Sequence, residues 1–195
     1  MKIAVFGCSH SGIGPRKWNH TWPFLLYKFT NLEINNFAIG GTSTQFQYEI
    51  FKDNIDNFDN FIFQFTMPHR LTKQIGSITQ IKKGTYTYFP NMTSHNLERS
   101  TAGSFNAEYK KWIKNDDGEI LNEYQNICKE VSSHEKCLFS FYMFRHKSNL
   151  QDIEIMQEIF PELLYDHSKK NLPGQHLSRK GNKVLAKYIK EKCKL

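Results

Sequence analysis

Short apolar runs alternate with amphipathic stretches along this chain. Four of the runs are rich in strand formers, at residues 2–6, 33–39, 59–65 and 136–144. The third run has an almost continuously apolar core, as expected for a strand that is buried on both faces of a sheet. Glycines follow the first two runs, and Pro68 ends the third. We therefore predict a strand at each of these four places.

The stretches between these runs have apolar residues at helical spacing. They predict helices at residues 21–29, 43–55, 104–115, 118–133 and 178–192. Thr21 or Asn19 is expected to cap the first helix, with Pro23 in its first turn, and Ser178 is expected to cap the last. The stretch 152–165 combines a short helix with a candidate edge strand. Alternating strands and helices predict a parallel α/β sheet with helices on both faces.

Residues 71–104 break this alternation. The segment is polar, rich in Thr, Ser, Gly and Asn, and shows no sustained period. Loops of this length in a compact domain are usually functional, so we interpret it as a lid or substrate-wall insertion in a single domain spanning 1–195. A disordered excursion is the alternative. Tyr86 and Tyr88 within it are candidates for stacking on sugar rings, and anchoring of the loop is their other use.

Composition and charge narrow the classes of partner. The chain has 195 residues, 39% of them hydrophobic, and a formal net charge of +7. The lysines concentrate only in the last stretch, which we interpret as the solvated face of the last helix, so no nucleic-acid partner is predicted. No segment has the character of a membrane span or a signal peptide, and the four cysteines form no CxxC pair. A reduced, cytoplasmic protein is expected, and its oligomeric state stays open.

The glycine-flanked turn after the first strand, Gly7-Cys8-Ser9-His10-Ser11, suits several chemistries. A phosphate-binding Walker loop would need Lys and Ser/Thr where Ile13 and Gly14 stand. A low-molecular-weight phosphatase would need an arginine at position 14, and Arg16 comes two residues late. The remaining interpretation is a serine nucleophile at Ser9. His176, in the loop before the last helix, is its candidate base, because loops at the carboxyl ends of parallel strands converge.

Taken together, these motifs resemble those of the SGNH hydrolases, the GDSL-like esterases. The turn "GCSHS" fits their first block except that Cys8 replaces an aspartate, and "NFAIGG" partly matches their second block, at Asn36 and Gly41. The third block is lost, with Pro68 in place of its asparagine. The last block ends at His176 without its aspartate, but "LSRKGNKVLA" resembles the family's helix entry.

The resemblance implies a three-layer α/β/α sandwich with a mainly parallel, flavodoxin-like sheet of about five strands. It also implies that Ser9 attacks an ester and that His176 is the general base. The backbone amides of Ser9 and Gly41 would form the oxyanion hole. Thr66, His69 or Arg70 is expected to replace the missing asparagine donor. Asp166 is the candidate third member of a triad, with a backbone carbonyl or a Ser–His dyad as alternatives.

The expected activity is hydrolysis of O-acyl esters, such as O-acetyl groups on carbohydrates, without a metal or an organic cofactor. His10, beside the nucleophile, is a candidate substrate contact, as are His69 and Arg70. Two other functions stay open. One is an O-acyltransferase that uses the same residues, and the other is a carbohydrate- or protein-binding module that kept the fold with a degenerate site.

Overall fold

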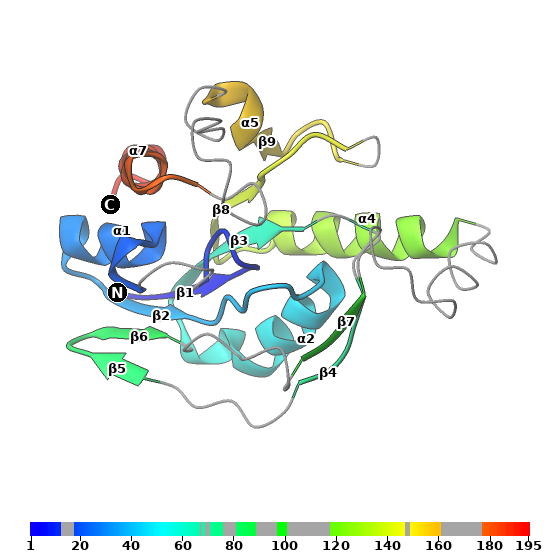
Figure 1. The fold of residues 1–195 in the computed structure, drawn as a ribbon, viewed down its shortest axis with the longest axis horizontal. Coiled ribbons are helices and arrows are strands. Elements are labelled where there is room, and N and C mark those ends of the chain that lie inside the picture. Colours follow the sequence, from blue (N-terminus) through cyan, green and yellow to red (C-terminus); the bar gives the residue numbers. More distant parts are fainter. Residues whose placement is uncertain are drawn as a thin grey trace.

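Seven strands form one sheet in the order β5-β6-β2-β1-β3-β8-β9 in the computed structural model of the chain (Figure 1). The structure describes residues 1–12, 18–66, 68, 71–75, 81–88, 97–100, 118–146, 149–160 and 177–195. Every pair of neighbouring strands in this sheet is parallel except β5 with β6. The carboxyl ends of the parallel strands therefore lie along a common edge.

The four predicted strands form the centre of the sheet. They are β1 (Lys2–Phe6), β2 (Glu33–Asn36), β3 (Asn60–Phe65) and β8 (Cys137–Tyr142). β2 is shorter than predicted, but the chain stays beside β1 beyond it, since Phe37 N donates to Val5 O and Ile39 N to Gly7 O. The edge strand β9 (Glu154–Ile155) precedes the short helix α5 (Met156–Ile159), within the stretch where a strand and a short helix were predicted.

Helices cover both faces of the sheet. On one face lie α1 (Trp22–Thr30) and α7 (Arg179–Lys192), and on the other lie α2 (Thr44–Asn54) and α4 (Glu119–Ser133). Side chains of β1 alternate between the two cores, with Ile3 and Val5 facing one and Ala4 and Phe6 the other. Single 3₁₀ turns precede α1 and follow α2, at Trp18–His20 and Ile55–Asn57. The predicted α/β sandwich is confirmed.

Local sequence signals explain where the helices begin. The Ser43 side chain accepts a hydrogen bond from Phe46 N at the start of α2, and the predicted cap Ser178 accepts one from Gly181 N at the start of α7. Thr21 occupies the cap position of α1, but its side chain does not make the capping hydrogen bond. Pro23 stands in the first turn, where its missing N–H costs no helical hydrogen bond. None of the described helices is long and apolar enough to cross a lipid bilayer.

The polar insertion contributes strands that its sequence did not predict. β6 (Tyr86–Tyr88) pairs with β2, and β5 (Ile81–Lys83) forms the antiparallel edge, so the sheet is larger than the expected five strands. A separate antiparallel pair joins β4 (Leu71–Ile75) to β7 (Leu97–Ser100). Three-residue strands are too short to show a period in sequence. The helix predicted at residues 104–115 lies outside the described residues.

Candidate active site

A hollow lies at the carboxyl ends of β1, β3 and β8, where the sequence predicted convergence. Its lining combines polar, aromatic and apolar side chains, from Cys8, His10, Gln64, Phe65, Thr66, Tyr142, Met143, Phe144, His146 and Asn149. Ser9 lies between two of these residues, in the turn that leaves β1, and is half-buried. The candidate nucleophile is therefore at this edge of the sheet, within reach of solvent.

The turn around Ser9 is tight and depends on glycine. Ser11 N and Gly12 N both donate to Cys8 O, at 3.0 and 2.7 Å. A side chain at position 12 would place its Cβ 2.5 Å from Ala38 O, closer than carbon and oxygen can approach. Gly12 thus allows the serine turn to pack directly on the segment that follows β2.

A buried hydrogen-bond network holds this turn against the central strand. The indole N–H of Trp22 donates to Ser11 Oγ over 3.1 Å. Because an indole N–H can only donate, the Ser11 hydroxyl accepts it and gives its own proton to Gln64 Oε1, 3.0 Å away. The same Gln64 oxygen accepts from Cys8 N at 3.2 Å, and Gln64 Nε2 donates to Phe65 O at 3.0 Å. Gln64 and Ser11 are almost entirely inaccessible to solvent.

This network separates the roles of the two serines in the turn. Ser11 is completely buried and its hydroxyl donates to Gln64, so its role is to hold the turn in place. Ser9 keeps part of its surface accessible. Of the two serines, Ser9 is therefore the one that stays a candidate nucleophile.

The loop that follows β2 carries Gly41, and it is also held by buried hydrogen bonds. Gln47 of α2 accepts a hydrogen bond from Gly7 N at 3.0 Å and donates to Thr42 Oγ1 at 3.0 Å. Gly41 has φ +84°, a left-handed conformation that favours glycine. Asn36 links the two loops, because its Nδ2 donates to Ser11 O and its Oδ1 accepts from Ala38 N. The two predicted oxyanion loops therefore form one connected unit, while the role of their amides stays a prediction.

Thr66 lines the hollow at the end of β3, and several of its polar groups are engaged. Its N–H donates to Thr44 Oγ1 at 2.9 Å, and the two threonine hydroxyls are 3.2 Å apart. Its carbonyl accepts from the Tyr124 hydroxyl at 2.7 Å. Burial raises the pKa of Tyr124 well above its ordinary value and that of nearby Cys128 to about 12. Both groups are therefore neutral at physiological pH, and Tyr124 keeps the proton that it donates to Thr66.

The candidate base His176 lies outside the described residues, but the chain immediately after it is well anchored. Leu177 is buried, and its carbonyl accepts from Asn182 Nδ2 at 3.3 Å. Asn182 Oδ1 in turn accepts from the backbone N–H of Trp22 at 2.9 Å. Trp22 is thus bonded to Ser11 through its indole and to the entry of α7 through its backbone. This places the residue after His176 close to the element that holds the Ser9 turn.

The other predicted site residues fall into three groups. Asp166, His69 and Arg70 lie outside the described residues, as does the side chain of Tyr88. His10 lines the hollow, and its ring makes a T-shaped contact with that of Phe144 at 5.2 Å between centroids. Tyr86 is fully buried beside Phe24 and Tyr27, and its hydroxyl accepts from Asn36. Its ring therefore has the position of a core anchor and exposes no face for a sugar.

Sequence reasoning missed the buried amides that hold the site. Gln64, Gln47 and Asn182 are each nearly inaccessible to solvent. For Gln64 a signal was present, since a single glutamine interrupts the apolar run "NFIFQF" of a strand expected to be buried on both faces. A buried amide requires partners, which indicates a polar network at that position.

Replacing Gln64 with leucine is expected to lower the free energy of unfolding by about 1–3 kcal/mol, because Cys8 N–H and the Ser11 hydroxyl lose their acceptor while the volume is kept. Urea denaturation followed by circular dichroism measures this, with the exposed Gln151→Leu as control. A Gln64→Leu protein as stable as the parent would show that the network contributes nothing.

Within the part of the chain that the structure describes, no group of three His, Cys, Asp or Glu side chains is arranged to hold a metal ion. The chain matches no protein-family model and no curated protein sequence. It is similar in structure to a protein assigned to the G-D-S-L family of lipolytic proteins from Desulfitobacterium hafniense DCB-2, with a TM-score of 0.50, 11% sequence identity and coverage of 98% of each chain. At this identity the likeness shows a shared fold along the whole chain.

Proposed function

We propose that this chain is a serine hydrolase that cleaves O-acyl esters, with Ser9 as nucleophile and His176 as general base. The observation that carries the proposal is the pair of hydrogen bonds that Trp22 donates, one from its indole N–H to Ser11 and one from its backbone N–H to Asn182. It ties the Ser9 turn to the segment that begins one residue after His176. The structural neighbour is assigned to the G-D-S-L family of lipolytic proteins, and this likeness supports a hydrolase activity in general without specifying the substrate.

In this mechanism the Ser9 hydroxyl attacks the ester carbonyl while His176 takes its proton. The negative charge that develops on the carbonyl oxygen is stabilised by the backbone amides of Ser9 and Gly41, and Thr66 is the candidate for a third donor. Collapse of this intermediate breaks the acyl–oxygen bond, and His176 returns the proton to the departing alcohol. Water then attacks the acyl-enzyme, with His176 as base, and releases the acid and Ser9. Asp166 is our candidate for orienting His176.

The rigid turn supports this assignment for a physical reason. A nucleophile must be held close to its productive position, and networks of buried hydrogen bonds fix the backbone on both sides of Ser9. Half-buried polar and aromatic side chains around the hollow suit a small acyl group on a polar alcohol such as a sugar. We therefore propose O-acetylated carbohydrates as the substrate class.

A fluorophosphonate probe tests the proposed nucleophile directly. We expect one covalent adduct per chain, which intact mass shows and peptide mapping places on Ser9, because only an activated serine reacts readily with such probes. Ser9→Ala should abolish labelling and Ser133→Ala, on the exposed surface of α4, should leave it unchanged. An adduct elsewhere, or none on the folded protein, would contradict the assignment and favour a binding module.

An O-acyltransferase would use the same nucleophile and would also be labelled. The two activities differ in the acceptor that resolves the acyl-enzyme. Adding an excess of a sugar alcohol during turnover and measuring acylated sugar against free acid separates them, and we expect free acid to dominate.

A further inference from the structure

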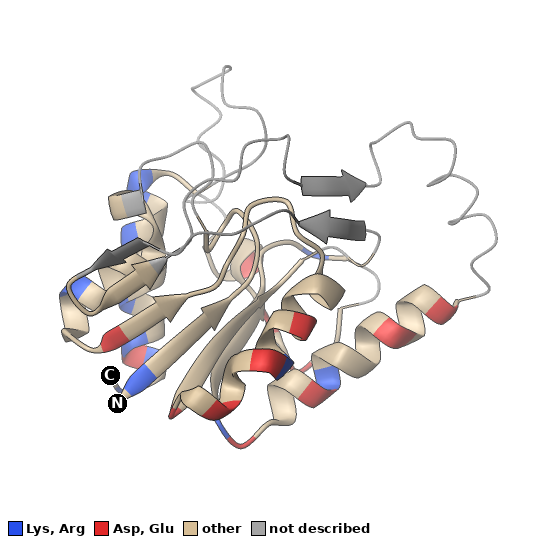
Figure 2. Ribbon diagram, turned by 90° about the horizontal axis from the view of Figure 1, so that it is seen from below, with Lys and Arg blue, Asp and Glu red and all other residues tan. Residues whose placement is uncertain are grey.

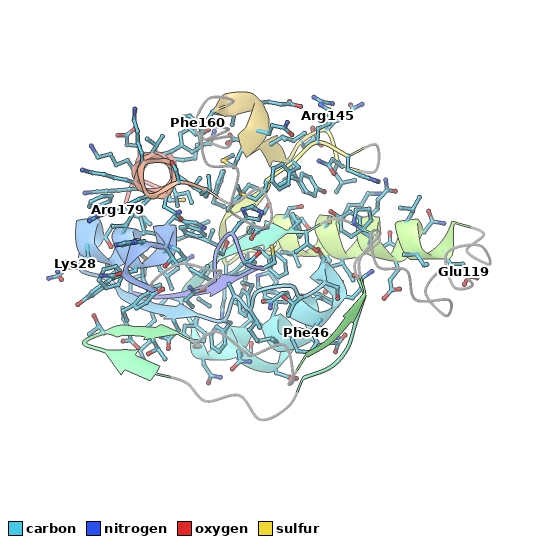
Figure 3. All side chains as sticks on the ribbon, in the orientation of Figure 1. Lys28, Phe46, Glu119, Arg145, Phe160 and Arg179 are labelled. Atoms are coloured by element: carbon cyan, nitrogen blue, oxygen red, sulfur yellow. The ribbon has the colours of Figure 1, made fainter. Side chains whose placement is uncertain are left out.

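The last helix, α7, carries an unusual ladder of positive charge. At 100° per residue, its cations Arg179, Lys180, Lys183, Lys187 and Lys190 fall within one arc, opposite the apolar residues that face the core. The first four are exposed and form no ion pair with any residue that the structure describes. Figure 2 shows blue segments recurring along α7, the upright helix that ends near the label C. Figure 3 looks along this helix and shows its long side chains spreading away from the sheet, with Arg179 labelled.

This ladder does not stabilise the helix that carries it. Like charges lie three or four residues apart, in the pairs Lys180–Lys183, Arg179–Lys183 and Lys183–Lys187, and each such pair is unfavourable. The first turn contains no acidic residue, so Arg179 and Lys180 stand at the positive end of the helix dipole. Among the described residues, the contacts between these cations and the rest of the fold come from the end of the helix, where Lys192 pairs with Glu154 and Lys190 Nζ donates to Phe29 O. Lys187 and Glu191 form one favourable pairing at i,i+4, but the repulsive pairs outnumber it, so the ladder adds little to helix stability and its exposed cations are available to a partner.

Charge on the opposite side of the sheet has the other sign. The acidic residues of α2 and α4 outnumber their lysines and are drawn in red along these two helices in Figure 2 (Glu49, Asp53, Glu119, Glu123 and Glu130 against Lys52 and Lys129). The described surface is thus polarised from one helical layer to the other. Such a distribution orients the molecule toward a negatively charged partner, with α7 facing it.

The form of the ladder favours a linear polymer. It follows a helix about 21 Å long whose first residue comes three positions after the candidate base His176 in the sequence. Among the described residues the exposed large hydrophobic side chains are Met1 and Ile159, neither of them on α7, so this face lacks the apolar anchors of a membrane-binding helix. It also lacks an exposed aromatic ring for stacking on bases, since Tyr188 is half-buried and bonds to Glu154.

We propose that the exposed cation ladder of α7 binds an acidic polysaccharide, whose anionic groups lie along the helix while an acylated sugar of the same chain reaches the site. Placement of the sugar in the site rests on the proposed function. Binding along α7 does not depend on it, because these lysines take no part in the chemistry.

Binding is tested with polygalacturonate as the probe and neutral dextran as its uncharged counterpart, using Ser9→Ala protein so that turnover cannot interfere. We expect binding to polygalacturonate that weakens steadily with added salt, and none to dextran. The double change Lys183→Glu and Lys187→Glu should weaken it about tenfold or more. The matched change Lys52→Glu and Lys129→Glu, on the acidic side with the same net charge, should alter it less than about twofold.

Equal weakening by both double variants would overturn the proposal, since it would reduce the effect to net charge. Tighter binding to duplex DNA or to phosphatidylserine vesicles than to polygalacturonate at equal salt would overturn it in favour of that partner. A melting curve confirms that the α7 variant folds. We expect its stability to be close to that of the parent, because Lys183→Glu makes the pairs with Arg179 and Lys180 attractive while positions 183 and 187 stay like-charged and Glu191 loses its pairing with Lys187.

Activity separates this proposal from the proposed function. If the chain hydrolyses p-nitrophenyl acetate, the α7 variant should keep that activity and lose its preference for O-acetylated polygalacturonate over O-acetylated dextran. A chain that binds polygalacturonate through α7 but cleaves no ester would refute the hydrolase and leave the polyanion surface standing. A chain that cleaves esters but does not bind polygalacturonate through α7 would refute the polyanion surface and leave the hydrolase standing.

Discussion

Replacing Ser9 with alanine is expected to lower kcat/KM for p-nitrophenyl acetate by about 10³-fold or more, down to the level set by the oxyanion hole and binding alone. The loss should appear mainly in kcat, because Ser9 would act only once the ester is bound. His176→Ala should lower the rate by a similar factor, and the double variant by no more than either single one, since the two residues would act as a unit.

The control for this measurement is Ser133→Ala, which changes an exposed serine far from the hollow and should leave the kinetics unchanged. Thermal unfolding of Ser9→Ala is measured beside that of the parent, so that a loss of rate is separated from a loss of fold. The Ser11 bonds to Gln64 and Trp22 are kept in this variant. Equal turnover by the parent and both single variants would mean background hydrolysis and would reject the serine mechanism.

The largest loss of stability is expected for Trp22→Ala, about 3–5 kcal/mol in the free energy of unfolding. Trp22 is fully buried between α1 and the sheet, where its ring meets Phe141 at 5.9 Å between centroids. Truncation leaves a large cavity and removes the proton that the indole donates to Ser11. Because domains of this size are stable by only about 5–15 kcal/mol, the variant should unfold at markedly lower denaturant concentration.

The matched variant Trp22→Phe separates packing from hydrogen bonding. It keeps most of the ring and loses the indole N–H, so we expect a smaller loss of about 1–2 kcal/mol. Urea titrations monitored by far-ultraviolet circular dichroism measure both variants without depending on tryptophan fluorescence. If Trp22→Ala costs no more than Trp22→Phe, the cavity is not the main cause and the packing of this residue has been overestimated.

Much of the architecture followed from the sequence because it is encoded locally. The apolar runs at 2–6 and 59–65 form strands, and the second of these is buried on both faces, as its almost continuous hydrophobicity predicted. Ser178 caps the last helix as its position before the amphipathic stretch indicated. The serine turn after β1 was recognisable because a strand, a glycine and small polar residues follow one another within ten positions.

Other features could not be predicted from local patterns. β6 is only three residues long, and it joins the sheet because Tyr86 finds Asn36, Phe24 and Tyr27 around it. The same burial removes Tyr86 from any role in stacking on a sugar. Gln64 looked like an irregularity in a strand until the partners of its amide were visible.

The sequence by itself therefore determined the four central strands, the helices that cover them, their alternation and the place of Ser9 in the turn after β1, since hydrophobic period and turn residues act over a few neighbouring positions. Only the tertiary structure decided how the site is held. The bond from Trp22 to Asn182 spans 160 positions, and that from Ser11 to Gln64 spans 53. Such pairs form because buried polar groups must find partners wherever the fold brings them, and no local pattern records which partner that is.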